Sequence, residues 1–288
     1  MIDQLVFEGH SKKNICWVLQ INRAEYYRKK AGKASVKNTA VQEKRNRQRE
    51  IVLVQIRQIK LEHPFWGYRR VRAYLQYKMG IKISYKLTYR LMKENNLLVD
   101  VKRYKAKRTP QRDKIKAEKQ NSVWGTDMTK FYIDTVGWFY FVVVLDWYTK
   151  KVVGWNLSLR SKAEQWIEAL NKAVDTELTQ GSREYNLMLV SDNGSQPTSI
   201  KYDNNCNLLE IKHITTSYSN PKGNADTERF FRTFKEEVVW SNVFDKVEDA
   251  RKAVENFMTF YNNDYPHSTL GYISPLDFEK QNNCSKVA

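Results

Sequence analysis

The sequence predicts an α/β protein, with a mixed β-sheet flanked by helices and small all-α units ahead of it. Three observations predict this class. Residues 121–160 hold three runs rich in aromatic and β-branched side chains, which is typical of strands. After residue 160, amphipathic segments alternate with short, fully apolar runs, which favours helices between buried strands. Residues 12–99 instead carry apolar side chains at helical spacing.

The order of the expected elements narrows the fold. Strands are expected at residues 126–133, 138–147, 152–159, 187–190 and 211–217. Amphipathic helices are expected at residues 163–178, 225–238 and 247–261. Three antiparallel strands, followed by helix, strand, helix, strand and helix, match the layout of a ribonuclease-H-like fold.

The N-terminal segment, residues 12–30, has the size and pattern of a helix-turn-helix unit. Asn22 is the expected N-cap of its second helix, Arg23–Lys30. A linker is expected at residues 31–40, and one amphipathic helix at residues 41–61.

A second helix-turn-helix unit is expected at residues 63–99. Gly80 breaks the chain there, and Ser84 can cap the helix that follows. Small basic helical units of this layout enter the major groove of DNA and take phosphate contacts from their flanks. The alternative is a helical hairpin that only packs on its neighbour.

The charge of the chain is unevenly distributed. The formal net charge is +17; residues 1–120 hold 31 Lys and Arg against 10 Asp and Glu, whereas residues 121–288 hold 18 against 22. Nine of the basic residues lie at 101–120, which we interpret as a basic connector. A basic half joined to a slightly acidic half predicts that one part binds a polyanion, with a generally basic surface as the alternative.

Several classes of protein are disfavoured. The longest apolar run, Trp138–Leu145, has eight residues, whereas a helix needs about 20 to span a bilayer. The first ten residues lack the pattern of a signal peptide. Three cysteines far apart argue against a disulfide framework, and four histidines without metal spacing argue against structural zinc. We therefore expect a cytoplasmic protein with no membrane partner.

Three acidic residues lie where a metal site would need them. Asp127 is on the first expected strand, Asp192 ends a buried strand, and Glu228 is on a helix whose phenylalanines form a separate apolar face. Phosphodiester cleavage fits such a set, because two Mg²⁺ or Mn²⁺ ions stabilise the attacking and leaving oxygens and prefer carboxylate ligands. Lys235, on the stripe of Glu228 and Arg232, would hold a DNA phosphate by charge.

Each acid also has a simpler explanation when it is taken alone. Asp127 could be a solvent-facing strand residue, Asp192 a turn cap, and Glu228 an i,i+4 partner of Arg232. The combination favours a site, because the neighbours of each acid independently place it at a strand end or on a polar face.

These segments resemble the three signatures of retroviral-integrase-like DDE transposases, above all the OrfB-type chains of bacterial insertion sequences. The segments are WGTDMTKFYI (124–133), LVSDNGSQPTS (189–199) and NADTERFFRTFKEE (224–237). The 35 residues between Asp192 and Glu228 are the gap typical of this family. Residues 261–278 resemble its C-terminal block, and residues 63–98 resemble the helix-turn-helix ahead of its catalytic domain.

The resemblance implies an integrase-type catalytic core that cuts strands at element ends, after which the freed 3′-OH attacks target DNA. It implies that Asp127, Asp192 and Glu228 bind two Mg²⁺ ions, with Mn²⁺ as a substitute. The residues expected to contact DNA are Lys235, Arg232, Asn193, Arg69, Arg70, Arg72, Lys86 and Arg90.

The chain departs from the family pattern at two positions. Gly223 stands where Asp is usual, and Tyr265 stands where Arg is common, which affects fine DNA contacts but leaves the metal ligands intact. We interpret Asp146 and His267, which match family positions, as structural, with a DNA contact as the alternative for His267. The His-His-Cys-Cys zinc module of retroviral integrases is absent from the sequence.

The expected organisation has four parts. They are an N-terminal helix-turn-helix-like segment with its linker (1–40), a helical DNA-binding region (41–100), the basic connector (101–120) and a ribonuclease-H-like integrase catalytic core (121–280). The expected partner is double-stranded DNA, both element ends and target, in the bacterial nucleoid. The resemblance also implies a homo-oligomer on DNA and a possible upstream OrfA-type partner joined by fusion.

Two other functions remain open from the sequence. One is a different ribonuclease-H-like nuclease, of the ribonuclease H or junction-resolvase type. The other is a non-catalytic DNA-binding regulator derived from a transposase.

Overall fold

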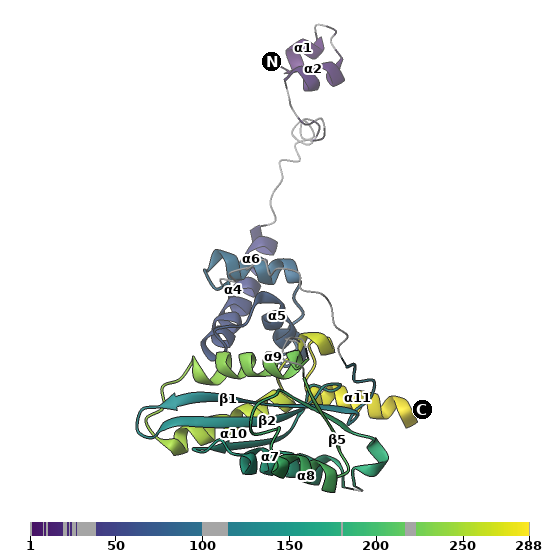
Figure 1. Ribbon diagram of the computed structural model, residues 1–288. Coiled ribbons are helices and arrows are strands. Elements are labelled where there is room, and N and C mark those ends of the chain that lie inside the picture. The colour runs from purple at the N-terminus through teal and green to yellow at the C-terminus, as the bar shows by residue number, and fades with distance from the viewer. Residues whose placement is uncertain are drawn as a thin grey trace. The chain divides into compact units, whose positions relative to one another are not determined.

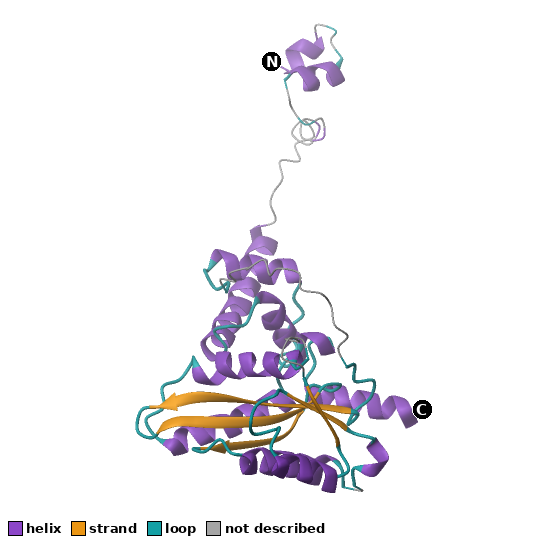
Figure 2. Cartoon of the chain, in the orientation of Figure 1, coloured by secondary structure: helices purple, strands orange, loops and turns teal. Residues whose placement is uncertain are grey.

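The structure is a computed structural model that describes residues 2–7, 9, 11–19, 22, 24, 27, 39–99, 115–179, 181–216 and 223–287 (Figures 1 and 2). The chain divides into two compact units, Met1–Arg57 and Gln58–Ala288. Each unit is described by itself.

The N-terminal unit begins with two short helices. They are α1 (Ile2–Phe7), which the sequence did not predict, and α2 (Lys12–Val18), which Ser11 caps by accepting a hydrogen bond from the Asn14 N–H. Asn22 accepts a hydrogen bond of 2.9 Å from the Ala24 N–H, as expected of an N-cap. Most of the helix expected after Asn22 and most of the expected linker lie outside the described residues. Helix α4 (Thr39–Glu62) confirms the helix expected at residues 41–61.

The expected helix-turn-helix at residues 63–99 is confirmed. Helix α5 (Tyr68–Tyr77) and helix α6 (Tyr85–Glu94) are separated by Gly80, whose φ of +68° suits glycine. Ser84 caps α6 by accepting a hydrogen bond of 3.2 Å from the Leu87 N–H. Most of the expected basic connector lies outside the described residues.

A mixed five-stranded sheet forms the centre of the second unit, and it confirms the predicted fold class. Its strands are β1 (Val123–Ile133), β2 (Gly137–Asp146), β3 (Val152–Ser158), β4 (Met188–Ser191) and β5 (Lys212–Thr215). The order is β3-β2-β1-β4-β5; β1, β2 and β3 are antiparallel, whereas β4 runs parallel to β1 and to β5. The central strand is therefore β1, and the carboxyl end of β4 lies beside it.

Helices cover both faces of this sheet (Figure 1). On one face, α7 (Ala163–Glu177) and α8 (Ile200–Leu208) bury Trp166 and Tyr202 against Trp124. On the other face, α9 (Ala225–Phe234) and α10 (Val247–Asn263) pack phenylalanines on β2; the ring centroids of Phe141 and Phe234 are 4.6 Å apart. The sequence placed α7, α9 and α10 but assigned no bounds to α8, and it did not predict α11 (Pro275–Val287).

Helix α9 differs from the prediction at its end. The sequence predicted one α-helix over residues 225–238, but the chain changes to a π-helical turn, η2 (Lys235–Val239), in which the Trp240 N–H bonds the Lys235 carbonyl at 2.8 Å. Short 3₁₀ turns lie at Arg183–Tyr185 and Ser268–Leu270. None of the helices in the described part of the chain is both long and apolar enough to cross a membrane.

Candidate active site

Asp127 lies in the central strand, opposite Val143 of β2. One of its carboxylate oxygens, Oδ1, accepts a hydrogen bond of 2.7 Å from the Met128 N–H. The pKa of Asp127 is raised to about 7: burial is the largest cause, the Met128 hydrogen bond opposes it, and the carboxylates of Asp192 and Glu228 add to it. A carboxyl in a central strand is thus both desolvated and faced by two other acids.

The close approach of α9 to β1 depends on Gly125. A Cβ at this position would lie 2.1 Å from Trp147 Nε1 and 2.4 Å from Thr227 Oγ1. Trp147 Nε1 itself donates to Thr227 Oγ1 over 3.3 Å. Glycine therefore lets the first turn of α9, which carries Glu228, lie directly against the strand that carries Asp127.

Asp192 follows the last residue of β4, as the sequence predicted for a strand end. Its Oδ1 accepts a hydrogen bond of 3.1 Å from the Gly194 N–H, which closes a short turn. The Asn193 amide donates to the carbonyl of Thr216, just after β5. Asp192 is exposed, so its carboxylate is accessible from solvent.

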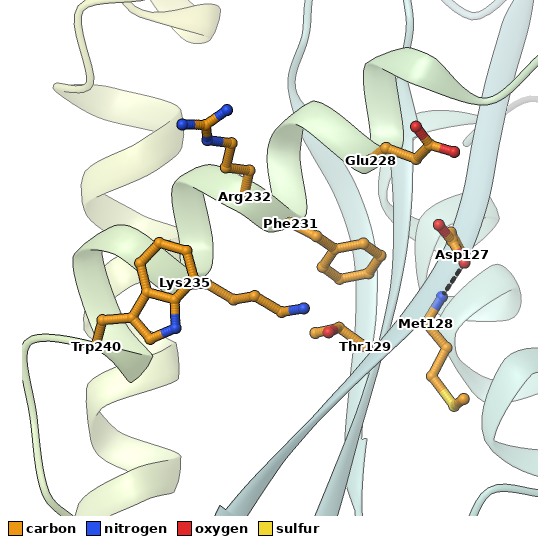
Figure 3. Close-up of a pocket in the computed structure, with 8 residues that line it drawn as sticks. All are labelled: Asp127, Met128, Thr129, Glu228, Phe231, Arg232, Lys235 and Trp240. Atoms are coloured by element: carbon orange, nitrogen blue, oxygen red, sulfur yellow. Dashed lines mark hydrogen bonds between the residues drawn. The ribbon is translucent and has the colours of Figure 1, made fainter. Parts of the chain in front are cut away.

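Glu228 and Lys235 line a pocket of about 380 Å³ together with Asp127 (Figure 3). Figure 3 shows the Lys235 side chain extending toward Asp127 and Thr129, and the charge of Lys235 lowers the pKa of Asp127. Arg232 also lines the pocket, but its guanidinium points away from the acids and forms a 3.0 Å ion pair with Glu236. The i,i+4 partner of Arg232 is therefore Glu236, and Glu228 is left for the pocket.

The three acids interact electrostatically, and this bears on whether the site fits a cation. Asp192 and Glu228 both raise the pKa of Asp127, so each of them repels the Asp127 carboxylate. In the part of the chain that the structure describes, no three His, Cys, Asp or Glu side chains already lie close enough to hold a metal ion. Asp127 and Glu228 line the pocket, and Asp192 acts on Asp127 from the end of β4 without lining it. Hard oxygen donors of this kind suit a divalent cation, because the cation would remove the repulsion on Asp127.

The residues expected to contact DNA differ in their surroundings. Arg69, Lys86 and Arg90 are exposed on α5 and α6. By contrast, the guanidinium of Arg70 lies 4.7 Å from the ring centroid of Tyr265, and Arg72 Nε donates to the Ile83 carbonyl at 3.0 Å.

Two residues that match family positions have structural surroundings. Asp146 is buried and accepts hydrogen bonds from the N–H groups of Asn121 (3.1 Å) and Tyr148 (2.8 Å), which confirms its structural interpretation. The pKa of His267 is lowered to about 4, mainly by burial and also by nearby cations, Lys150 first. His267 is thus neutral at pH 7 and bonds Thr269 at 2.8 Å.

Sequence reasoning missed two residues of the pocket region. Trp240 lines the pocket with its indole exposed, and Glu237 bonds His63 and Trp66 from the turn that follows Lys235. A glycine inside a strand, as at Gly125, does signal a close approach. Nothing in the local sequence pairs Glu237 with residues 174 and 171 positions away.

Comparison with known families assigns a class to this arrangement. Residues 117–221 and 209–275 match models described as an integrase core domain, and residues 46–105 match a model described as an HTH-like domain. The chain is therefore a polynucleotidyl transferase of the integrase and transposase class, and its partner is DNA.

Individual relatives identify the family. The transposase for insertion sequence element IS904 of Lactococcus lactis is 30% identical, over 82% of this chain and 96% of that relative. The putative transposase InsK for IS150 of Escherichia coli is 28% identical, over 77% and 80%. The HTLV-2 integrase catalytic core domain is 15% identical over 57% of this chain and 99% of that one, with a TM-score of 0.44. By its identity to the IS904 transposase over most of both chains, this chain belongs to the insertion-sequence transposases of the DDE type.

Proposed function

We propose that this chain cuts DNA phosphodiesters at the ends of its own insertion sequence and joins the freed 3′-OH ends to target DNA, with Asp127, Asp192 and Glu228 as the ligands of divalent cations. The observation that supports this assignment is electrostatic. Asp127 is a desolvated carboxyl whose pKa is raised to about 7 by burial and by the other two acids. Mg²⁺, or Mn²⁺ in its place, fits these oxygen donors, and a pair of such ions is expected.

The chain's own residues have distinct roles in this proposal. The bound cations would supply charge stabilisation for the attacking and leaving oxygens. Gly125 keeps the strand with Asp127 and the helix with Glu228 in contact, and the turn of Asp192 holds the third acid at the end of β4. Lys235 extends into the same pocket, where its ammonium group would bind a phosphate by charge.

The α5–α6 unit would bind the DNA next to the cut. Lys86, Tyr89, Arg90 and Lys93 are exposed and fall on one stripe of α6. Such a stripe suits phosphate and major-groove contacts. Asn193 and Arg232 would contact DNA nearer the acids.

Substitution of Asp192 by Asn tests the catalytic assignment. Cleavage of DNA that carries the element end should fall to background in Mg²⁺, while binding in gel-shift assays changes little. Asp175→Asn, which changes an exposed carboxylate on α7, is the matched control and should retain cleavage. Cleavage by Asp192→Asn at the wild-type rate would refute the assignment.

We also propose that the acting form is at least a dimer, because two element ends must be paired. Fusion to an upstream OrfA-type product would add a further DNA-binding module, as the family resemblance implies. Gel shifts with the isolated chain should then show weak binding to the ends, and the fused protein should show strong binding. Equal, tight binding by both proteins would contradict the role of the fusion. The place of action is the bacterial nucleoid, where the DNA is.

A further inference from the structure

A buried carboxylate connects the catalytic pocket to the helix-turn-helix. Glu237 lies in η2, two residues after Lys235, and its side chain is 6% exposed. Glu237 Oε2 lies 2.7 Å from His63 Nδ1, and Oε1 accepts a hydrogen bond of 2.6 Å from Trp66 Nε1. Both oxygens of one buried carboxylate therefore bind the segment that leads into α5. Glu237, His63 and Trp66 are called the Glu237 cluster below.

Stacked aromatic rings also restrain the Glu237 cluster. The rings of His63 and Trp66 stack at 3.9 Å between centroids with an interplanar angle of 6°. The ring of Phe260 in α10 also stacks near His63, at 5.0 Å and 14°. Lys60 Nζ donates to the Trp66 carbonyl at 3.2 Å. The segment before α5 is thus held by a charged acceptor, by stacking and by a lysine.

Contacts at both ends of α5 fix this helix to the residues that follow α10. Arg70 lies over the ring of Tyr265, and Lys78 forms an ion pair with Asp264. Tyr265 itself is buried. Tyr265 stands where the family usually has arginine, and here it packs on α5. The basic stripe of α6 remains exposed to solvent.

We propose that Glu237 is a positioning residue, which fixes the helix-turn-helix to the helix that carries Glu228 and Lys235 and thereby sets which phosphate of the bound DNA is cut. This inference rests on the proposed function. The physical reason is that η2 joins Lys235 directly to Glu237, so any shift of the Glu237 cluster is transmitted to the pocket over one helical turn. A displacement of about 1 Å in an active site can reduce a rate by about 100-fold.

A purely structural role makes a different prediction. If Glu237 only stabilised the fold, its loss would lower the folded fraction and the overall activity, but every folded molecule would still cut at the same phosphate. If it sets the register between α6 and the pocket, its loss distributes cuts over neighbouring phosphates. The position of the cut therefore separates the two roles.

The experiment uses the full chain and a DNA fragment that carries the gene's own flanking element end. Cut positions in Mg²⁺ are mapped at nucleotide resolution, and rate, gel-shift affinity and thermal midpoint are measured in parallel. The variants are Glu237→Ala, Glu237→Gln and Trp66→Phe, which keeps an aromatic ring but lacks the indole N–H. Glu255→Ala, an exposed glutamate on α10, is the matched control.

We expect Glu237→Ala to scatter the cuts and to slow them about 10- to 100-fold, with DNA affinity within about threefold of wild type, since the α6 stripe is untouched. Glu237→Gln should recover part of the precision, because its amide oxygen still accepts from Trp66. Trp66→Phe should show intermediate scatter, and it provides the test if Glu237→Ala does not fold. Glu255→Ala should cut like wild type.

Cuts by folded Glu237→Ala or Trp66→Phe at the wild-type phosphate with wild-type precision would overturn the inference, whether or not the rate falls. Failure of the wild-type chain to make any Mg²⁺-dependent cut would instead refute the proposed function. The two failures are therefore distinguishable.

Discussion

The side-chain amide of Asn224 donates a hydrogen bond of 3.1 Å to the backbone carbonyl of Thr126. Asn224 immediately precedes α9, and Thr126 is the residue before Asp127 in β1. Both residues are buried. This bond, across 98 positions of the chain, fixes the first turn of the helix with Glu228 relative to the strand with Asp127.

Asn224→Ala should therefore lower both stability and cleavage. The substitution leaves the buried carbonyl of Thr126 without its donor, which costs about 1–3 kcal/mol, and it releases the start of α9 from β1. Denaturant unfolding measures the first effect and strand cleavage the second. Asn263→Ala is the control, because Asn263 is an exposed residue of α10 that bonds only within its own helix, to the Thr259 carbonyl. Equal losses in both variants would contradict the role given to Asn224.

Gly125→Ala should disturb the site more strongly than its single methyl group suggests. The new Cβ would overlap Trp147 Nε1 and Thr227 Oγ1, so α9 must move away from β1. Overpacking of this kind costs about 1–3 kcal/mol, and we expect cleavage to fall by more than the change in folded fraction. Gly67→Ala is the matched control, because a Cβ there has no atom within 4 Å. Gly67 is the N-cap residue of α5, so this variant should lose at most the small stability that glycine gives at an N-cap. Wild-type cleavage by Gly125→Ala would show that the close approach is not needed.

The sequence predicted the sheet well because its signals are local. The strand ends lie within three residues of prediction, and Ser84 and Gly80 act as the cap and break that their chemistry indicated. Helix α8 was not delimited, because its apolar side chains are not gathered on one face. The π turn at Lys235 was not predicted, because its residues are ordinary helix formers.

Long-range contacts account for the rest. The sequence grouped Arg70 with Arg69 and Lys86 as DNA contacts, since all three are basic and lie in one helical unit. The structure places Arg70 against Tyr265, a residue 195 positions away, while the other two are exposed. The helical periodicity of the sequence cannot predict this contact, because the orientation of the Arg70 side chain depends on the residues that pack against α5.

Arg70→Ala and the double variant Lys86→Ala/Arg90→Ala should therefore have opposite signatures. Arg70→Ala loses packing on Tyr265, so its thermal midpoint should fall while the salt dependence of DNA affinity stays near wild type. The double variant should keep its thermal midpoint, bind DNA more weakly, and lower the slope of log affinity against log salt by about 2. A lower slope for Arg70→Ala would show that Arg70 contacts phosphate after all.

Mg²⁺ should stabilise the folded chain through the three acids. A ligand that binds only the folded state adds stability as its concentration rises above its dissociation constant, and here it also removes the repulsion that Asp192 and Glu228 exert on Asp127. The thermal midpoint should therefore rise on Mg²⁺ addition and return after chelation. Asp127→Asn should abolish most of this rise, whereas Asp134→Asn, in an exposed turn, should retain it. The same rise in Asp127→Asn would place the cation elsewhere.

Asp146 should make stability fall as pH rises from about 4 to about 6. Burial raises its folded pKa from 3.8 to about 6, although the N–H groups of Asn121 and Tyr148 partly oppose this. In that window the unfolded chain has already lost the proton that the folded chain keeps, so ionisation favours unfolding. The stability of wild type relative to Asp146→Asn, which cannot ionise, should therefore decrease by about 2–3 kcal/mol between pH 4 and pH 7. Urea unfolding at several pH values measures the difference, with Asp134→Asn as the comparison. A difference that grows with pH would mean that the hydrogen bonds to the carboxylate outweigh its desolvation.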